Sequence, residues 1–169
     1  ENASAVTRDY VLKLEHNGGS APLLNIFGGK ITTYRKLAEA AISEISSFFP
    51  HLDAPWTANS SLPGGDFKVE DVAKLIEKLA ADFNFLTEIR AKRLIRAYGL
   101  NAWELLKGAT KLEDLGEQFG EFLTQREVEY LRKNEFAIEA DDIIWRRTKL
   151  GLKMSEQDVK RLSKYLKTS

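Results

Sequence analysis

Apolar residues in the second half of the chain recur at steps of three and four residues, which is the period of an α-helix. The first such series consists of Val69, Val72, Ile76, Leu79 and Phe83. Residues spaced in this way lie on one face of a helix. A second helix is expected between Thr87 and Gly99. The threonine hydroxyl can cap its first turn, and glycine readily adopts the left-handed conformation found at helix ends.

Further helices are expected at 102–106, 125–135 and 141–149. A last helix is expected after Ser155, because this serine can accept a hydrogen bond from the first turn. Glu156 and Asp158 follow it at the positive end of the helix dipole, where acidic residues are favourable. The sequence beyond residue 65 therefore predicts an all-helical domain.

The first part of the chain alternates with a period of two, with Tyr10, Leu12 and Leu14 on one side. This pattern predicts a strand over 7–15, and a second apolar run over 23–27 completes a hairpin. Two strands alone are marginally stable in water. We therefore expect the hairpin to belong to a larger sheet.

A helix over 33–49 is expected to follow the hairpin. Its apolar stripe consists of Leu37, Ala41, Ile45 and Phe48. Thr32 or Thr33 is the expected N-cap, and Pro50 ends the helix because proline cannot donate a backbone hydrogen bond. The segment 50–65 is rich in Pro, Ser and Gly, which is typical of a linker.

These patterns predict a mostly α fold in three parts. Residues 1–49 form a hairpin and helix left over from larger domains, 50–65 form a linker, and 66–169 form a C-terminal all-helical domain. The chain begins with Glu1, and its only methionine is Met154. We therefore expect it to be a piece of a longer protein.

Composition excludes several classes of function. The 25 basic residues balance the 25 acidic ones, so a global field that would attract nucleic acid is absent. There is no cysteine, and His16 and His51 lack neighbouring ligands, so no metal site is expected. No apolar run reaches the roughly 18 residues that a membrane-spanning helix needs. We expect a cytoplasmic protein, with peripheral contact to the inner face of the membrane as the alternative.

Charge is segregated along the chain. Residues 111–142 hold four basic and ten acidic residues, a net charge of −6, and residues 146–167 hold eight basic and two acidic residues, a net charge of +6. We expect these blocks to face each other or the solvent, and contact of the basic block with anionic lipid is the alternative. The basic residues of the helix that follows Thr87 are expected to form a solvated face. They are Arg90, Lys92, Arg93 and Arg96.

The junction between the second strand and its helix is the candidate site for chemistry. It reads Gly28-Gly29-Lys30-Ile31-Thr32-Thr33. The first amides of a helix have no intrahelical partner, and glycines let another molecule approach the backbone. With Lys30, these amides favour negative charge such as a reduced flavin carries on its N1–C2=O edge. Spacing alone would favour an ordinary turn with a surface lysine.

The surrounding sequence resembles the closing motif of FAD-dependent, aerobic glycerol-3-phosphate dehydrogenases. The matching stretches are Thr7-Arg8-Asp9-Tyr10, Ala21-Pro22-Leu23-Leu24, Phe27-Gly28-Gly29-Lys30-Ile31-Thr32-Thr33-Tyr34-Arg35-Lys36-Leu37-Ala38-Glu39, Trp56, Leu62-Pro63-Gly64-Gly65, Asp114-Leu115-Gly116, Phe119-Gly120, Asp141-Asp142 and Trp145-Arg146-Arg147-Thr148-Lys149. The resemblance covers nearly the whole chain. It implies a flavoprotein similar to D-amino-acid oxidases, with an FAD domain, a substrate-cap domain and a C-terminal helical domain.

The resemblance also implies roles for individual residues. Gly28 and Gly29, with the amides around Thr32 and Thr33, would bind the pyrimidine edge of FAD. Lys30 would be catalytic, between flavin and substrate.

The resemblance further implies that Arg8 binds the substrate phosphate, because a planar guanidinium can donate two hydrogen bonds to it. The implied reaction oxidises sn-glycerol 3-phosphate to dihydroxyacetone phosphate by hydride transfer to FAD, with electrons passing to a quinone. Glycerophosphate oxidases, which reduce oxygen, share the motif, so the acceptor stays open.

The dinucleotide-binding fingerprint of such enzymes is missing from this chain. We therefore expect the isolated chain to be inactive and not to retain FAD. The exposed hairpin offers a surface for dimerisation. A rival hypothesis makes the helical part a partner-docking or membrane-docking module without a catalytic role.

Overall fold

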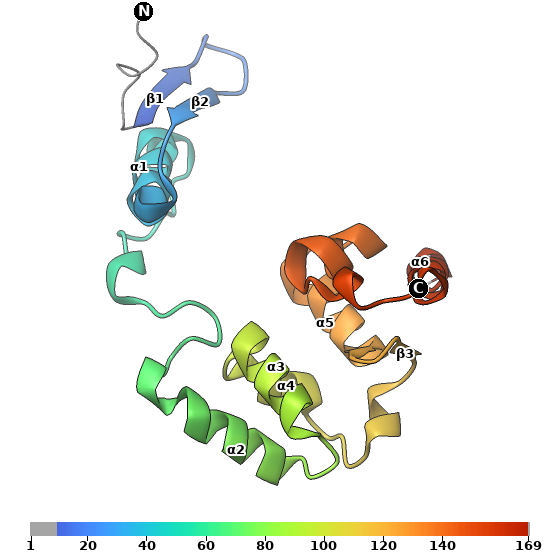
Figure 1. Ribbon diagram of the computed structural model, residues 1–169. Helices are drawn as coiled ribbons and strands as arrows, with labels where there is room; N and C mark the ends of the chain where they lie inside the picture. Colours follow the sequence, from blue (N-terminus) through green and yellow to red (C-terminus); the bar gives the residue numbers. More distant parts are fainter. Residues whose placement is uncertain (1–9, 169) are drawn as a thin grey trace, which may run out of the picture. The chain divides into compact units, whose positions relative to one another are not determined.

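The computed structural model describes residues 10–168, which fall into two compact units, one up to residue 61 and one from residue 62 onward (Figure 1). We describe each unit by itself. Most of the described residues are helical. The described part of the chain also contains two small sheets of two antiparallel strands each. The prediction of a mostly α fold with an N-terminal hairpin and helix is confirmed.

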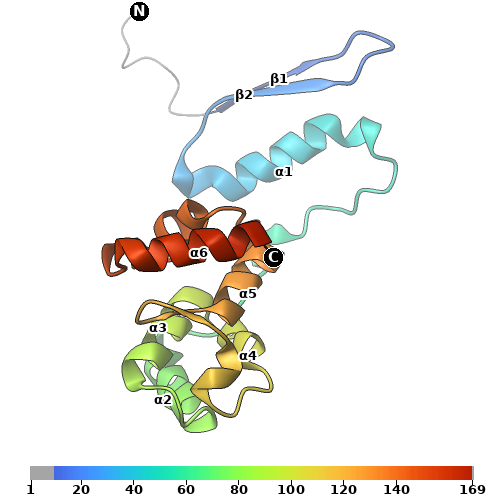
Figure 2. The ribbon, with the colours of Figure 1, turned by 90° about the vertical axis from the view of Figure 1, so that its right-hand side faces the viewer.

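The first unit is a hairpin with one helix along it. Strands β1 (Tyr10–Glu15) and β2 (Leu23–Gly28) pair antiparallel, with Leu12 opposite Ile26. Helix α1 (Tyr34–Ile45) runs alongside the hairpin and contacts both strands (Figure 2). A short 3₁₀ turn, Ser46–Phe48, follows α1.

Burial in this unit is incomplete on both faces of the hairpin. Leu12 and Leu14 are half-buried, whereas Val11 and Phe27, which lie opposite each other across the strands, are about half exposed. None of the described residues up to 61 is buried. The first unit therefore has no closed hydrophobic core within the part of the chain described.

The second unit consists of helices around one core. Its α-helices are α2 (Val72–Asp82), α3 (Glu88–Tyr98), α4 (Asn101–Leu106), α5 (Gln125–Glu135) and α6 (Glu156–Thr168). Short 3₁₀ helices lie at Val69–Asp71, Leu112–Leu115 and Leu150–Leu152. The buried residues of α3 show the helical period that builds this core. They are Ala91, Leu94, Ile95 and Tyr98.

Two helix caps expected from the sequence are present. The Thr87 hydroxyl accepts a hydrogen bond from the Arg90 amide at 3.3 Å. The Ser155 hydroxyl accepts one from the Asp158 amide at 3.2 Å. Thr124 caps α5 in the same way. These bonds satisfy amides that the first turn of a helix leaves unpaired.

A small second hairpin was not expected from the sequence. Strands β3 (Gln118–Phe119) and β4 (Leu123–Thr124) form it, immediately before α5. Phe119 and Leu123 lie opposite each other and are fully buried. The hairpin therefore serves as part of the core.

The helix expected over 141–149 is a π-helix, Asp142–Arg147. The amide and the hydroxyl of Thr148 both donate to the carbonyl of Ile143, at 3.0 and 2.8 Å. Arg147 Nε donates to the carbonyl of Glu135 at 2.8 Å and ties the turn to the end of α5. The Asp142 carboxylate accepts from the amides of residues 138 and 139 and so ties the start of this helix to the segment before it.

Two glycines at the start of the second unit explain part of the Pro-Gly-Gly motif. Gly64 and Gly99 both have positive φ angles, 77° and 54°. A Cβ on Gly64 would lie 2.2 Å from the carbonyl oxygen of Tyr98, and one on Gly99 would lie 2.1 Å from the carbonyl oxygen of Gly64. Leu100 N donates to Gly64 O at 2.9 Å. The chain is thus anchored to the α3–α4 turn at residue 64.

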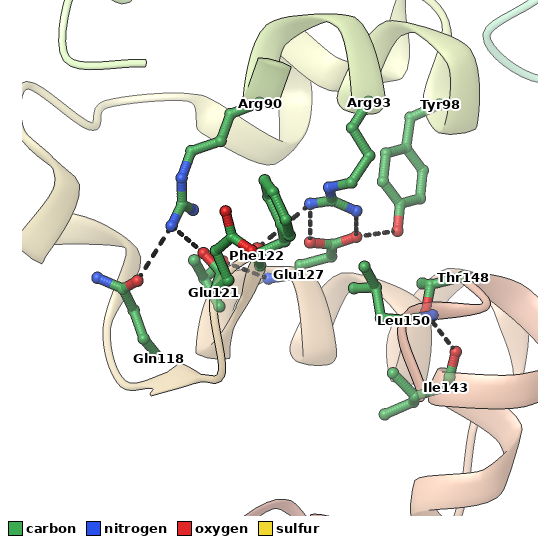
Figure 3. A network of polar contacts seen from close by, with 11 residues as sticks. Arg90, Arg93, Tyr98, Gln118, Glu121, Phe122, Glu127, Ile143, Thr148 and Leu150 are labelled. Atoms are coloured by element: carbon green, nitrogen blue, oxygen red, sulfur yellow. Dashed lines mark hydrogen bonds and ion pairs between the residues drawn. The ribbon is translucent and has the colours of Figure 1, made fainter. Parts of the chain in front are cut away.

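The expectation of a solvated basic face on α3 is wrong for two of its four residues. Arg93 donates through both terminal nitrogens to the carboxylate of Glu127, at 2.7 and 2.6 Å, and Tyr98 donates to the same carboxylate at 2.6 Å (Figure 3). Arg90 donates to Gln118 and to the carbonyl of Glu121. These arginines tie α3 to the second hairpin and to α5.

This network is largely sealed from solvent. The Glu127 side chain is 1% exposed and that of Arg93 is 20% exposed. Desolvation lowers the pKa of Arg93, but the hydrogen bonds and charge of Glu127 outweigh it, so the pKa is raised. Burial, followed by the charge of Glu127, raises the pKa of Tyr98 as well. Arg93 and Tyr98 therefore keep their protons and remain donors at neutral pH.

The two oppositely charged blocks face each other in part. Arg161 on α6 pairs with Glu117 at 3.2 Å, and Arg146 pairs with Glu139 at 3.6 Å and with Asp142 at 2.9 Å. These exposed pairs contribute little to stability individually.

We predict that Glu127→Gln lowers the free energy of unfolding of the second unit by about 3 kcal/mol. The change leaves the Arg93 guanidinium largely desolvated without its counter-ion, and breaking such pairs costs about 3–5 kcal/mol. Denaturant unfolding followed by circular dichroism measures the loss. Glu77→Gln, the same change at an exposed position on α2, is the matched control and should stay within about 0.5 kcal/mol of the parent.

We also predict that a shortened chain, residues 62–169, folds alone. It keeps the whole buried core and the Gly64 anchor, so it should stay helical and unfold cooperatively on heating. Circular dichroism during a thermal scan is the measurement. A gradual loss of signal without a transition would mean that the helices depend on residues before 62.

Candidate functional site

The candidate site is the junction between β2 and α1. Gly28 and Gly29 leave the strand with φ angles of 78° and 104°, in the region that favours glycine. Lys30 is extended, with φ −124° and ψ 147°. A single 3₁₀ turn, Ile31–Thr33, then leads into α1. The residues proposed from the sequence therefore lie together in one continuous turn.

Packing as well as backbone conformation favours glycine at position 29. A Cβ at this position would lie 3.1 Å from the terminal methyl carbon Cδ2 of Leu37 on the second turn of α1. The strand end thus passes close over the helix that it precedes. A larger residue would have to displace Leu37 and adopt a strained backbone conformation.

The expected threonine cap is absent, which corrects the sequence-based prediction. The hydroxyl of Thr33 donates to the carbonyl of Lys30 at 3.2 Å, and the Thr33 amide donates to the same oxygen at 3.0 Å. Neither Lys30 nor Thr33 caps a helix with its side chain. The first amides of this turn therefore receive no side-chain acceptor at the cap positions.

The electrostatics of this helix start differ from those in the second unit. No acidic residue lies in the first turn of α1 or of the 3₁₀ turn before it. Each α-helix of the second unit has an acidic residue in its first turn or in the 3₁₀ turn that precedes it. Lys30, Arg35 and Lys36 instead place three cations near the positive end of α1. The arrangement is complementary to an anion.

The residues present fit the edge of a flavin in chemical terms. The junction offers backbone amides, a lysine and two glycines without side chains, all of them exposed or half-exposed. Ile31 is 85% exposed and Tyr34 is 53% exposed, so apolar surface lies beside the amides. Arg8, proposed for the substrate phosphate, lies outside the described residues.

Sequence reasoning missed a polar network on the next turn of α1. Arg35 pairs with Glu39 at 3.0 Å. Thr57, in the segment that follows the helix, donates its hydroxyl hydrogen to the Glu39 carboxylate and accepts a hydrogen bond from Arg35 at 3.2 Å. The Thr57 hydrogen bond and then Arg35, against desolvation, lower the pKa of Glu39. The spacing of Arg35 and Glu39 signalled their pairing, whereas nothing in the sequence pointed to Thr57.

The segment around Thr57 also encloses a hollow against α1. Its volume is about 740 Å³, and its apolar lining includes Ile42, Leu52 and Trp56. Trp56 is 69% exposed. The segment expected as a linker is therefore held against α1 in this part.

Metal-binding clusters and membrane-spanning helices are both absent from residues 10–168. No group of three or more His, Asp or Glu residues there is arranged to bind a metal ion. No helix in the same range combines the length and the apolar character that crossing a membrane requires.

A family model described as the C-terminal domain of alpha-glycerophosphate oxidase matches residues 55–168. The chain belongs to this family. The match covers the second unit and the end of the first. Together with the relatives that follow, this match confirms the resemblance to the C-terminal part of aerobic glycerol-3-phosphate dehydrogenases.

Individual relatives extend the match to the hairpin and α1. The chain is 47% identical to a glycerol-3-phosphate dehydrogenase of Pseudomonas aeruginosa, over 99% of the chain and 33% of the relative. It is 40% identical to the aerobic glycerol-3-phosphate dehydrogenase of Escherichia coli, over 98% of the chain and 33% of the relative. The chain spans about a third of the length of these relatives.

The relatives of this chain also include an oxidase. The chain is 32% identical to the alpha-glycerophosphate oxidase of Enterococcus casseliflavus, over 86% of the chain and 23% of the relative. Dehydrogenases and an oxidase thus share this C-terminal region.

Proposed function

We propose that this chain is the C-terminal part of a flavoenzyme that oxidises sn-glycerol 3-phosphate to dihydroxyacetone phosphate, with FAD as the hydride acceptor and a quinone as the final acceptor. The start of α1 carries the proposal, because it combines two glycines, an uncapped helix start without acidic residues, and Lys30. The relatives named for glycerol-3-phosphate dehydrogenase activity support the substrate.

The residues of the junction have distinct roles in this proposal. The chemistry that FAD supplies when bound is the acceptance of a hydride, which leaves negative charge on the N1–C2=O edge of the flavin. Backbone amides around Thr32 and Thr33 would donate to that edge, and Gly28 and Gly29 would let it approach the backbone. Lys30 would supply a full positive charge between the flavin and the substrate.

Arg8 is assigned to the substrate phosphate on the sequence match alone. Its guanidinium can donate two parallel hydrogen bonds to phosphate oxygens, which fixes the orientation of the substrate. The same match assigns residues 1–49 to the FAD and substrate-cap domains and residues 66–169 to the helical domain. The half-exposed faces of the hairpin are consistent with a unit that other parts of a larger protein cover.

A docking role for the helical domain is the second candidate, and exposed apolar residues in the second unit favour it. Phe136 is 85% exposed and Ile138 is 80% exposed. Phe136 also has a φ of 55°, a left-handed conformation that bulky residues rarely adopt. Exposed apolar side chains of this kind mark interaction surfaces when they form a patch.

We predict that the isolated 169-residue chain is colourless and inactive. One edge contact at 28–33 cannot hold FAD, because the adenine and the pyrophosphate need a glycine-rich turn that this sequence does not contain. The measurement is the visible spectrum after incubation with excess FAD and desalting. Flavin retained at one equivalent per chain would overturn this expectation.

We predict that Arg8→Ala and Lys30→Met in the full-length protein impair glycerol 3-phosphate turnover far more than folding. A hydrogen bond to a charged group contributes about 1.5–3 kcal/mol. Since about 1.4 kcal/mol is a factor of ten, Arg8→Ala should raise KM at least about tenfold. Steady-state kinetics with a quinone analogue as acceptor, in the absence of oxygen, measure both variants.

A thermal scan of each variant controls for folding, and Lys68→Met, at an exposed position in the second unit, is the matched lysine control. Unchanged kinetics in either site variant would remove that residue from the proposed site. Turnover with oxygen but not with the quinone analogue would replace the dehydrogenase assignment with an oxidase.

A further inference from the structure

The three cations at the start of α1 are not equivalent. Lys30 is exposed, and none of the carboxylates in residues 10–168 lies within ion-pair distance of it. Lys36 is exposed as well. Arg35 is different, because its guanidinium is 3.0 Å from the Glu39 carboxylate, and only about a third of its side chain is exposed. The positive charge of Arg35 is therefore neutralised locally.

The direction of the Arg35 side chain follows from the geometry of the pair. Residues four apart are stacked along one side of a helix, about 6 Å apart along the axis. The pairing with Glu39 and the hydrogen bond to Thr57 thus hold the guanidinium of Arg35 between the first two turns of α1 and the segment that contains Thr57. A free arginine in this first turn would instead add a full charge beside the positive end of the helix dipole.

Thr57 completes the arrangement. Its hydroxyl accepts a hydrogen bond from Arg35 and donates one to Glu39, so it holds both partners at once. The three groups are half-buried, in a unit whose other polar side chains are mostly exposed. Serine could make both hydrogen bonds, whereas valine could make neither.

We infer that Glu39 and Thr57 are positioning residues for the flavin edge: they neutralise the charge of Arg35, so that Lys30 and the amides of residues 31 and 32 set the positive potential there. This inference rests on the proposed function. It assigns to residues 39 and 57 a role in tuning the reduction potential of the flavin, although neither touches it. More positive charge near the edge stabilises the reduced, anionic flavin and raises its potential.

The test measures the flavin midpoint potential in the full-length protein with FAD bound. Lys30→Met should lower the potential, because it removes a cation. Glu39→Gln should raise it, because it frees the charge of Arg35. Each change should alter the ratio of reduced to oxidised flavin at a fixed ambient potential by roughly three- to tenfold, as expected when one unit charge changes near a partly solvated site.

Double and conservative variants separate charge from structure. Adding Arg35→Gln to Glu39→Gln should return the potential to within about twofold of the parent ratio, because the net charge is restored. Thr57→Val should shift the potential in the direction of Glu39→Gln, and Thr57→Ser should leave it unchanged. Glu44→Gln, an exposed position on the same helix, is the matched control for loss of one acidic residue.

The outcomes distinguish this inference from the function on which it rests. A full-length protein that binds no flavin overturns the proposed function. Flavin binding with a shift in Lys30→Met but none in Glu39→Gln overturns the inference alone. A shift in Glu39→Gln that the Arg35→Gln change does not reverse overturns it too, because the effect would then not pass through the charge of Arg35.

Discussion

The second unit depends on one buried carboxylate. Glu127 lies in the first turn of α5, yet its side chain is buried and accepts hydrogen bonds from Arg93 and Tyr98 on α3. Its own amide is capped by Thr124 at 3.4 Å. Glu127 thus fixes the positions of α3, α5 and the β3–β4 hairpin relative to one another. A desolvated charge is stable only with such partners, so the loss of one partner weakens the whole network.

The same network shows what a buried charge demands. Arg93 places two of its nitrogens on Glu127, but its Nε is buried without a hydrogen-bond partner, which makes it an exception among the buried side-chain nitrogens and oxygens of residues 10–168. An unpaired buried donor costs about 1–3 kcal/mol. The pair therefore contributes more to the definition of the packing than to the net stability. Apolar residues such as Leu94 and Ile95, from the same helix, supply the burial itself.

How much could be read from the sequence differed from element to element. α3 and α5 follow from apolar spacing and from local capping signals, because both depend on residues within a few positions of each other. The β3–β4 hairpin could not be predicted, since strands of two residues show no period. The π-helix depends on Arg147 reaching the carbonyl of Glu135, twelve residues earlier. Contacts of that kind leave no periodic trace in a sequence.

Whether a charged residue is enclosed or exposed was the least predictable feature, because this too depends on contacts between residues far apart in the sequence. Arg93 and Lys92 are neighbours on one helix, yet one is enclosed by Glu127 from 34 residues away and the other is exposed. At the candidate site, the glycines and Lys30 were recognisable from the motif, because their role depends on backbone conformation and local charge. Thr57 was not, because its partners lie 18 and 22 residues away.

The two units treat their helix starts in opposite ways, and this contrast is the physical reason to look for function at the first. In the second unit, hydroxyl groups cap α3, α5 and α6, and every α-helix has an acidic residue in its first turn or in the 3₁₀ turn before it. At α1 the threonine hydroxyl donates to the carbonyl of Lys30, the first turn holds no acidic residue, and a lysine precedes it. The positive end of this helix therefore has neither a side-chain cap nor an acidic residue in its first turn. Local rules that are kept elsewhere and broken at one place are expected where another molecule supplies the missing partner.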